Sequence, residues 1–178
     1  MAEDVKNRET VDQRVRMLLD SGDWTAVHAL ISEGQGAALL PALEDALHGD
    51  CRFACIQAST ALSQIGEAAV SVLIKAIASD SIRVCWSAAW ALGEIGPAAA
   101  EQAIPALLQV IKSPNDQIGS AVATALSKFQ PQAHEIASTL AGYLSHMDYE
   151  EHACWALVQL GPEAAPATPA LVENLRHD

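Results

Sequence analysis

Aromatic side chains are scarce in this sequence: they make up 4% of its 178 residues, although 51% of the residues are hydrophobic. The alternation of apolar and polar residues that marks a half-buried strand is also missing. A core of Ala, Leu, Ile and Val without large rings suits closely packed helices better than a sheet. The sequence therefore predicts an all-α fold.

Basic residues are also few. Ten Lys and Arg stand against 22 Asp and Glu, which gives a formal charge of −12. No cluster of Lys or Arg offsets this charge locally, so phosphate backbones and anionic membrane surfaces would be repelled. We expect neither nucleic acid nor a membrane as a partner.

Two kinds of apolar segment are absent as well. No uninterrupted apolar run reaches the ~18 residues that mark a membrane-spanning helix. The amino terminus, MAEDVKNRET, is too polar for a secretory signal. We therefore expect a cytoplasmic protein.

One pattern is present and recurs, most clearly over residues 83–111, which read RVCWSAAWALGEIGPAAAEQAIPALLQVI. Val84, Ala88 and Leu92 lie on one face of a helix with 3.6 residues per turn. Gly96 ends this helix, because glycine readily takes the left-handed conformation at a helix C-terminus. A second helix is predicted to begin near Ala103, with Pro105 in its first turn.

Equivalent helix ends recur at residues 34, 66, 96, 130 and 161, a spacing of 30 to 34 residues that indicates stacked helix pairs. We predict a flexible segment over residues 1–9, followed by a single repeat domain over 10–178. Its predicted parts are five units and a terminal helix, at residues 10–34, 36–66, 67–96, 98–130, 132–161 and 166–177.

An alanine-leucine pair occupies the same place in four of the predicted second helices. These pairs are Ala61-Leu62, Ala91-Leu92, Ala125-Leu126 and Ala156-Leu157. The small residue lets neighbouring helices approach closely, and the leucine fills the layer between repeats. Because no helix pair can bury its apolar face alone, the pattern predicts an α-solenoid of about five antiparallel helix pairs.

These residues resemble the HEAT repeat, and in particular the short HEAT-like repeats of the phycobilisome-lyase type. The segment AAWALGEIGPAAAEQAIPALL is close to that consensus, and Arg83-Val84 after Asp80 fits the start of its second helix. The fourth and fifth units depart from the pattern, with Gln117-Ile118 and Asp148-Tyr149 in this place. The resemblance implies that the second helices line the concave face. The family includes bilin lyase subunits, deoxyhypusine hydroxylase and many scaffold proteins.

If the resemblance holds, Trp86, Trp90 and Gly93 point away from the buried side of their helix and into the groove. The equivalent positions of other units are Trp24, His28, Ile56, Thr60, Ser120, Thr124, Glu151 and Trp155, so all four tryptophans fall on this surface. Exposed tryptophan is a common anchor in protein interfaces. The alternative is that the rings cover gaps between neighbouring helices.

We predict a non-catalytic scaffold that binds a protein or peptide in this groove. The predicted partner-binding residues are Trp86, Trp90, Glu94, Thr124, Glu151 and Trp155. The tryptophans would act as anchors, and the two carboxylates would favour a basic partner. The terminal helix lacks a second half, and a monomer is favoured over an end-to-end dimer.

Two enzymatic readings stay open as alternatives. A bilin lyase subunit would hold a flat tetrapyrrole in a tryptophan-lined groove. The di-iron hydroxylase uses His-Glu pairs on inner helices, but the His134-Glu135 pair lies on an expected outer helix. Cys55 and Cys85 occupy the same position in adjacent repeats, yet no base is placed to activate either thiol. We expect reduced cysteines and predict no catalytic residue, metal or cofactor.

Overall fold

The computed structural model describes residues 15–144 and 150–174, and the regular elements over these residues are all helices. The prediction of an all-α fold is therefore confirmed. The predicted flexible segment, residues 1–9, lies outside the described residues. After a helix over residues 15–21, the α-helices are α2 Trp24–Leu30, α3 Gly36–His48, α4 Arg52–Ile65, α5 Val70–Ile77, α6 Ile82–Ile95, α7 Ala100–Val110, α8 Asp116–Leu126, α9 Ala133–Ala141, α10 Glu150–Leu160 and α11 Thr168–Asn174. Tighter or wider helical turns join them: η1 Ile31–Gln35, η2 Gly66–Ala69, η3 Gly96–Ala99, η4 Gln130–Gln132 and η5 Gly161–Ala167.

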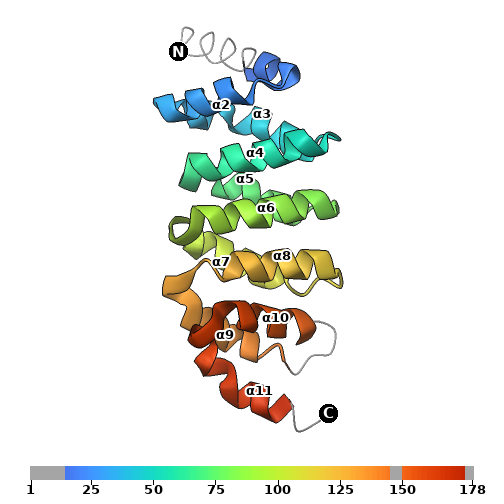
Figure 1. Cartoon of the computed structure of the whole chain (residues 1–178), viewed down its shortest axis with the longest axis vertical. Helices are drawn as coiled ribbons and strands as arrows, with labels where there is room; N and C mark the ends of the chain where they lie inside the picture. The colour runs from blue at the N-terminus through green and yellow to red at the C-terminus, as the bar shows by residue number, and fades with distance from the viewer. Residues whose placement is uncertain (1–14, 145–149, 175–178) are drawn as a thin grey trace.

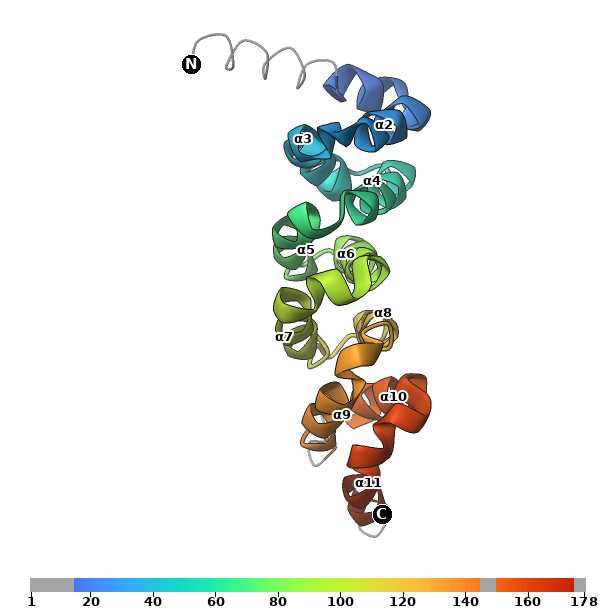
Figure 2. The same ribbon diagram turned by 90° about the vertical axis from the view of Figure 1, so that its left-hand side faces the viewer.

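The helices stack in chain order from one end of the molecule to the other (Figure 1). The first helices of the pairs, α3, α5, α7 and α9, form one layer, and α2, α4, α6, α8 and α10 form the second (Figure 2). Within the second layer, α4 packs on α6, α6 on α8, and α8 on α10. The buried apolar residues form one continuous cluster from Val15 to Ala167. The chain is an α-solenoid, as the repeat pattern predicts.

The stack is bowed, with α5 and α7 toward the outer side of the curve and the second helices toward the inner side (Figure 2). We call the outward surface of α4, α6, α8 and α10 the second-helix face. This surface contains the positions at which the sequence predicts partner contacts.

Glycine ends most of the second helices. Gly34, Gly66, Gly96 and Gly161 have φ values of 82°, 76°, 65° and 61°, a left-handed conformation that costs glycine little. The fourth pair lacks this glycine, and there the chain turns at Phe129, whose ring is fully buried. A buried aromatic ring thus occupies the corner that a glycine turn forms in the other repeats.

The predicted start of one first helix is wrong. Helix α7 begins at Ala100, three residues before Ala103, so Pro105 lies inside the helix instead of in its first turn. The reason is that η3, with Pro97 in its first turn, leads directly into α7. Pro97 therefore takes the helix-starting role that the sequence pattern assigns to Pro105.

Residues 52–77 are long enough to cross a membrane, and they contain an 18-residue window with a mean hydropathy of 1.3. They do not form one helix. The backbone turns at Gly66, where φ is 76° and ψ is −137°, and the two halves become α4 and α5 in different layers of the stack (Figure 2). Their apolar residues are largely those of the inter-helix core.

Close approach between second helices depends on small residues. A Cβ atom added to Gly93 would lie 3.1 Å from the Cα of Ala125 on the next helix. Gly93 is buried at this contact between α6 and α8, so the prediction that it faces the groove is wrong. Its role is to let the two helix backbones approach one another.

Gly119 on α8 makes room for a larger group, the imidazole ring of His152 on α10. A Cβ atom at position 119 would lie 2.3 Å from the ring. The ring is buried, and its Nδ1 atom lies 3.1 Å from the carbonyl oxygen of Ile111. Because a carbonyl only accepts, Nδ1 carries the proton and donates it. The Nε2 atom lies 3.4 Å from Oδ1 of Asp116, so His152 joins α10 to both helices of the preceding pair.

This packing predicts that Gly119→Ala destabilises the protein, because the added methyl group displaces a buried, hydrogen-bonded ring. Overpacking of this kind costs about 1–3 kcal/mol. In a His152→Ala background the same change should stabilise the protein by up to about 1 kcal/mol, since alanine is the better helix former. Urea denaturation of the four proteins of this double-mutant cycle measures both effects. Equal destabilisation in the two backgrounds would contradict the proposed contact.

Candidate protein-binding face

The four tryptophans fall into two groups. Trp86 is 45% exposed and Trp155 is 47% exposed, whereas Trp24 is only 7% exposed. Trp90 is partly buried and packs against the core. The prediction that all four rings face the groove is therefore wrong for Trp24. That residue starts α2 directly after the tight turn at Gly22, and its ring is enclosed in this corner of the first pair.

The N-terminal halves of α4 and α6 carry an exposed apolar patch. We define the patch as Phe53, Ile56, Ile82 and Trp86, all of which are exposed large hydrophobic residues. The two helices are in register here, because Sγ of Cys55 lies 3.4 Å from Oγ of Ser87. This contact brings Ile56, beside Cys55, next to Trp86, beside Ser87.

The sequence analysis missed Phe53 and Ile82. Both lie in the first turn of their helices, where Phe53 is three residues before Ile56 and Ile82 is four residues before Trp86. The available signal was the occurrence of large apolar residues in the exposed first turn of two consecutive second helices. Solvated helix starts usually carry polar residues there.

Charged side chains border the patch. Asp50 and Asp80 lie at the turns that lead into α4 and α6, and both are exposed. Of the two arginines near them, Arg52 is exposed. Arg83 instead donates a hydrogen bond of 2.7 Å from Nη2 to the carbonyl oxygen of Gly49. Both arginines keep their positive charge, so they balance Asp50 and Asp80 locally, and the excess of negative charge is that of the whole chain, −12.

Polar side chains cross-link the C-terminal halves of the second helices. Glu94 on α6 forms an ion pair with Lys128, just beyond α8. His28 on α2 lies 2.7 Å from Oε1 of Gln64 on α4, measured from Nδ1. The expectation that Glu94 meets a basic partner is corrected here, because Lys128 of the next repeat already neutralises it. Sequence reasoning did not pair these residues, which lie 34 positions apart at the same place in successive repeats.

The predicted residues on α8 and α10 lie farther along the face. Thr124 is exposed, and its hydroxyl donates to the carbonyl oxygen of Ser120 at 2.9 Å. Glu151 is exposed in the first turn of α10, where a carboxylate interacts favourably with the helix dipole. Since packed helices lie 8–10 Å apart, Trp86 on α6 and Trp155 on α10 are about 20 Å apart. Small side chains of α8 lie between them.

The thiols show no sign of activation. All four cysteines are free. Cys55 contacts Ser87 instead of Cys85, and burial raises the pKa of Cys85 to about 11. Burial, followed by the charges of Glu150 and Glu151, also raises the pKa of Cys154. Raised pKa values keep a thiol protonated and poorly nucleophilic.

Metal coordination requires several converging ligands. Within residues 15–144 and 150–174, no three His, Cys, Asp or Glu side chains gather closely enough to hold a metal ion. His134 lies 3.0 Å from Oε2 of Glu163, measured from Nδ1. His134, the histidine of the His134-Glu135 pair, thus contacts a side chain of η5 at the surface. What the described face offers is apolar area and negative charge.

Residues 37–127 and 70–151 match the family of HEAT repeats. These two overlapping segments cover more than half of the chain. The chain belongs to the HEAT-repeat family. A search of curated proteins finds no match.

The HEAT array is also similar to a solved structure, the crystal structure of an engineered protein that was a target of the Northeast Structural Genomics Consortium. The TM-score is 0.53 at 22% sequence identity, with 94% of this chain and 79% of that chain covered. At this identity the likeness shows the fold alone. It supports the HEAT-repeat solenoid and carries no information on a partner.

The exposures of the tryptophans predict how a quencher acts on their fluorescence. The emission of Trp86 or Trp155 is the difference between the spectra of wild type and of Trp86→Phe or Trp155→Phe. Acrylamide should strongly quench this emission, because both rings are nearly half exposed. The emission lost on Trp24→Phe should be blue-shifted and protected. Difference spectra between wild type and each variant provide the measurement. A protected Trp86 would mean that its ring is covered and would remove it as an anchor.

The cysteines predict a second, pH-dependent result. At pH 8 a thiol reagent should modify Cys51 first, because it is exposed, whereas Cys85 should react only after unfolding.

Folding raises the pKa of Cys85 from 9.0 to about 11, so the thiol ionises at lower pH in the unfolded state than in the folded state. The contribution of the Cys85 thiol to the free energy of unfolding is therefore constant below pH 9 and falls as the pH rises toward 11. Cys85→Ala should remove this part of the pH dependence, as measured by denaturation between pH 7 and 11.

Proposed function

We propose that this HEAT-repeat protein is a non-catalytic scaffold that binds a segment of another protein on its second-helix face. The apolar patch of Phe53, Ile56, Ile82 and Trp86 carries this proposal, because contiguous exposed apolar residues on a soluble surface mark interaction sites. Trp86 is its central anchor. A large, rigid ring that is already half enclosed needs little further ordering when a partner covers it.

Charge defines the partner further. The chain has a formal charge of −12, and Asp50 and Asp80 lie beside the patch. A segment with apolar side chains flanked by Lys or Arg would place its cations against these carboxylates. One of these cations can also stack on the Trp86 ring. This preference comes from the net negative charge of the chain and from Asp50 and Asp80, since Glu94 is paired with Lys128.

The distance along the face sets the length of the segment. If Trp155 is a second anchor, the partner must span about 20 Å from the patch across α8. An extended peptide covers this distance with about six residues, and a helix with about thirteen. The small, exposed Ser120 and Thr124 leave α8 low enough for the segment to pass over it.

The two enzymatic alternatives lack such support. A bilin needs an enclosed apolar slot with cations for its propionates, whereas the exposed tryptophans lie on an open surface two helices apart. A di-iron centre needs clustered ligands, and none occur among the described side chains.

A cytoplasmic location and a monomeric state remain part of the proposal. Cell fractionation tests the location, and light scattering tests the monomeric state.

Peptides selected on the wild-type protein from a random displayed library test the proposal. We expect selected sequences to combine apolar residues with Lys or Arg. Trp86→Ala should weaken their binding by at least about 2 kcal/mol, which is roughly 30-fold. Met17→Ala is the matched control, since Met17 is an exposed apolar residue of the first described helix and should leave affinity unchanged.

The charge argument has its own variant. Replacing Asp50 and Asp80 together by Asn should lower the affinity of the same peptides and flatten its dependence on salt. Fluorescence anisotropy of labelled peptides at several salt concentrations measures both effects. Peptides that lack basic residues, or that bind equally well to Trp86→Ala, would refute the proposed site.

A further inference from the structure

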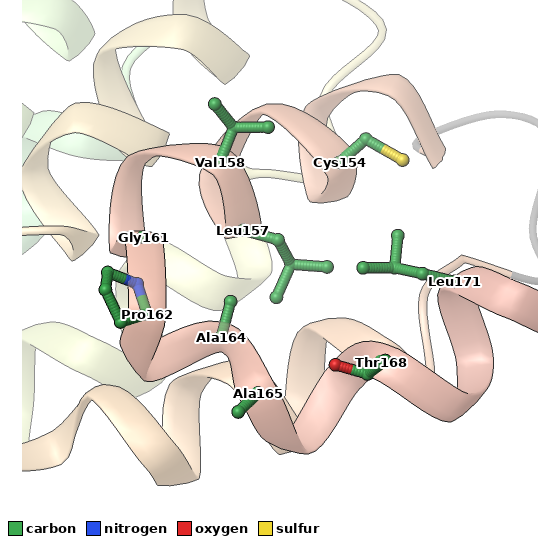
Figure 3. A pocket seen from close by; sticks show the side chains of 9 residues that line it. All are labelled: Cys154, Leu157, Val158, Gly161, Pro162, Ala164, Ala165, Thr168 and Leu171. Carbon is green, nitrogen blue, oxygen red and sulfur yellow. The ribbon is translucent and has the colours of Figure 1, made fainter.

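A second apolar surface lies at the C-terminal end of the stack, away from the patch on α4 and α6. Here α10, η5 and α11 enclose an open cavity of about 610 Å³. Figure 3 shows the side chains of Leu157 and Leu171 approaching each other across it, with Cys154 and Val158 along the α10 side. Its lining residues are Cys154, Leu157, Val158, Gly161, Pro162, Ala164, Ala165, Thr168 and Leu171. Thr168 carries the only polar side chain in this set besides the thiol.

The repeat itself shows what covers such a surface. Counting back from the helix-ending glycines, Cys154 occupies the position of Ala89 on α6, and Val158 occupies that of Gly93. Ala89 and Gly93 are buried, because α8 packs on this side of α6. Val158, in contrast, is 70% exposed. The side of α10 that bears Val158 is thus the side that a further helix covers in the repeats before it.

The residues on this side are larger than their counterparts on α6, Ala89 and Gly93. At Gly93 an added Cβ would already press against the backbone of α8. A valine at this position would therefore push the two helices farther apart. With Val158 and Cys154 in these places, a helix that packs on α10 lies farther from it than α8 lies from α6. The cavity between α10 and α11 instead provides depth for the side chains of a helix that lies farther away.

Charge indicates the kind of helix. Residues 129–175 contain no Lys or Arg and six acidic residues, Glu135, Asp148, Glu150, Glu151, Glu163 and Glu173. Glu163 is in contact with His134, while Glu151 and Glu173 are exposed on α10 and α11. A second copy of this chain would bring like charges together here. A cationic partner would be attracted.

We infer that the groove between α10 and α11 is a docking site for an amphipathic α-helix of another protein, with an apolar stripe flanked by Lys or Arg. The apolar side chains of that helix enter the cavity between Leu157 and Leu171 and cover Val158. Its basic residues face Glu151 and Glu173. The site is separate from the Trp86 patch and does not depend on the function proposed for it.

A synthetic fourteen-residue peptide of Leu and Lys, with the leucines at helical spacing, is the probe. Its binding is compared between wild type, Val158→Lys and Gln159→Lys by calorimetry. Gln159 is the exposed neighbour of Val158 outside the cavity lining, so both variants gain the same charge. We expect Val158→Lys to weaken binding at least tenfold and Gln159→Lys to change it less than threefold.

A second measurement follows the site directly. In a Cys51→Ser background, the peptide should slow the modification of Cys154 by a thiol reagent, because Cys154 lines the cavity. A peptide of the same pattern with Glu in place of Lys should bind at least tenfold more weakly and leave the modification rate unchanged.

Three results would overturn the inference. Equal loss of affinity in both lysine variants would show that only charge is sensed. Binding that disappears in Trp86→Ala and persists in Val158→Lys would place the peptide on the other surface. A dimer in light scattering that Val158→Lys dissociates would identify a second copy as the occupant.

Discussion

The close approach of successive second helices is the contact on which the rest of this molecule depends. It is possible because glycine and alanine occupy the facing positions, as Gly93 does against Ala125. Such contacts leave no room for large side chains between the helices. Large residues on these helices must then lie either in the layer between α-helix pairs, as the leucines do, or on the outer surface. Tight stacking therefore accounts for the position of large apolar residues on the surface of these helices.

Variation in this contact changes the local geometry of the array. At Gly119 the space left by the missing side chain holds a whole imidazole ring, which then bonds to the preceding pair through Ile111 and lies near Asp116. At the end of the stack Val158 occupies the place that Gly93 has on α6, and the surface stays open. Small residues at two different places of the second helix, those of Gly93 and Gly119, thus set how closely the next helix or side chain approaches.

The second-helix face has two regions that differ in their polar contacts. Toward the C-terminal ends of the helices, the Glu94–Lys128 ion pair and the contact between His28 and Gln64 satisfy polar groups within the array. Toward the N-terminal ends, acidic side chains lie beside exposed apolar ones. Exposed ion pairs contribute little to stability, so the first region mainly fixes the register of the repeats. The second region combines exposed apolar area with charged side chains.

The sequence by itself determined the helical class, the repeat and most helix ends, because these follow from local rules: period, glycine turns and the small-residue columns. Gly96 and the alanine-leucine pairs needed no tertiary information. Which surface residues are free was decided only by the tertiary structure, since it depends on neighbours one repeat away. Trp24 and Trp86 occupy equivalent columns, yet one ring is enclosed at the end of the array and the other is open. Lys128 pairs with Glu94 across two helices, and the cavity beside Val158 exists because no helix of the described chain packs there.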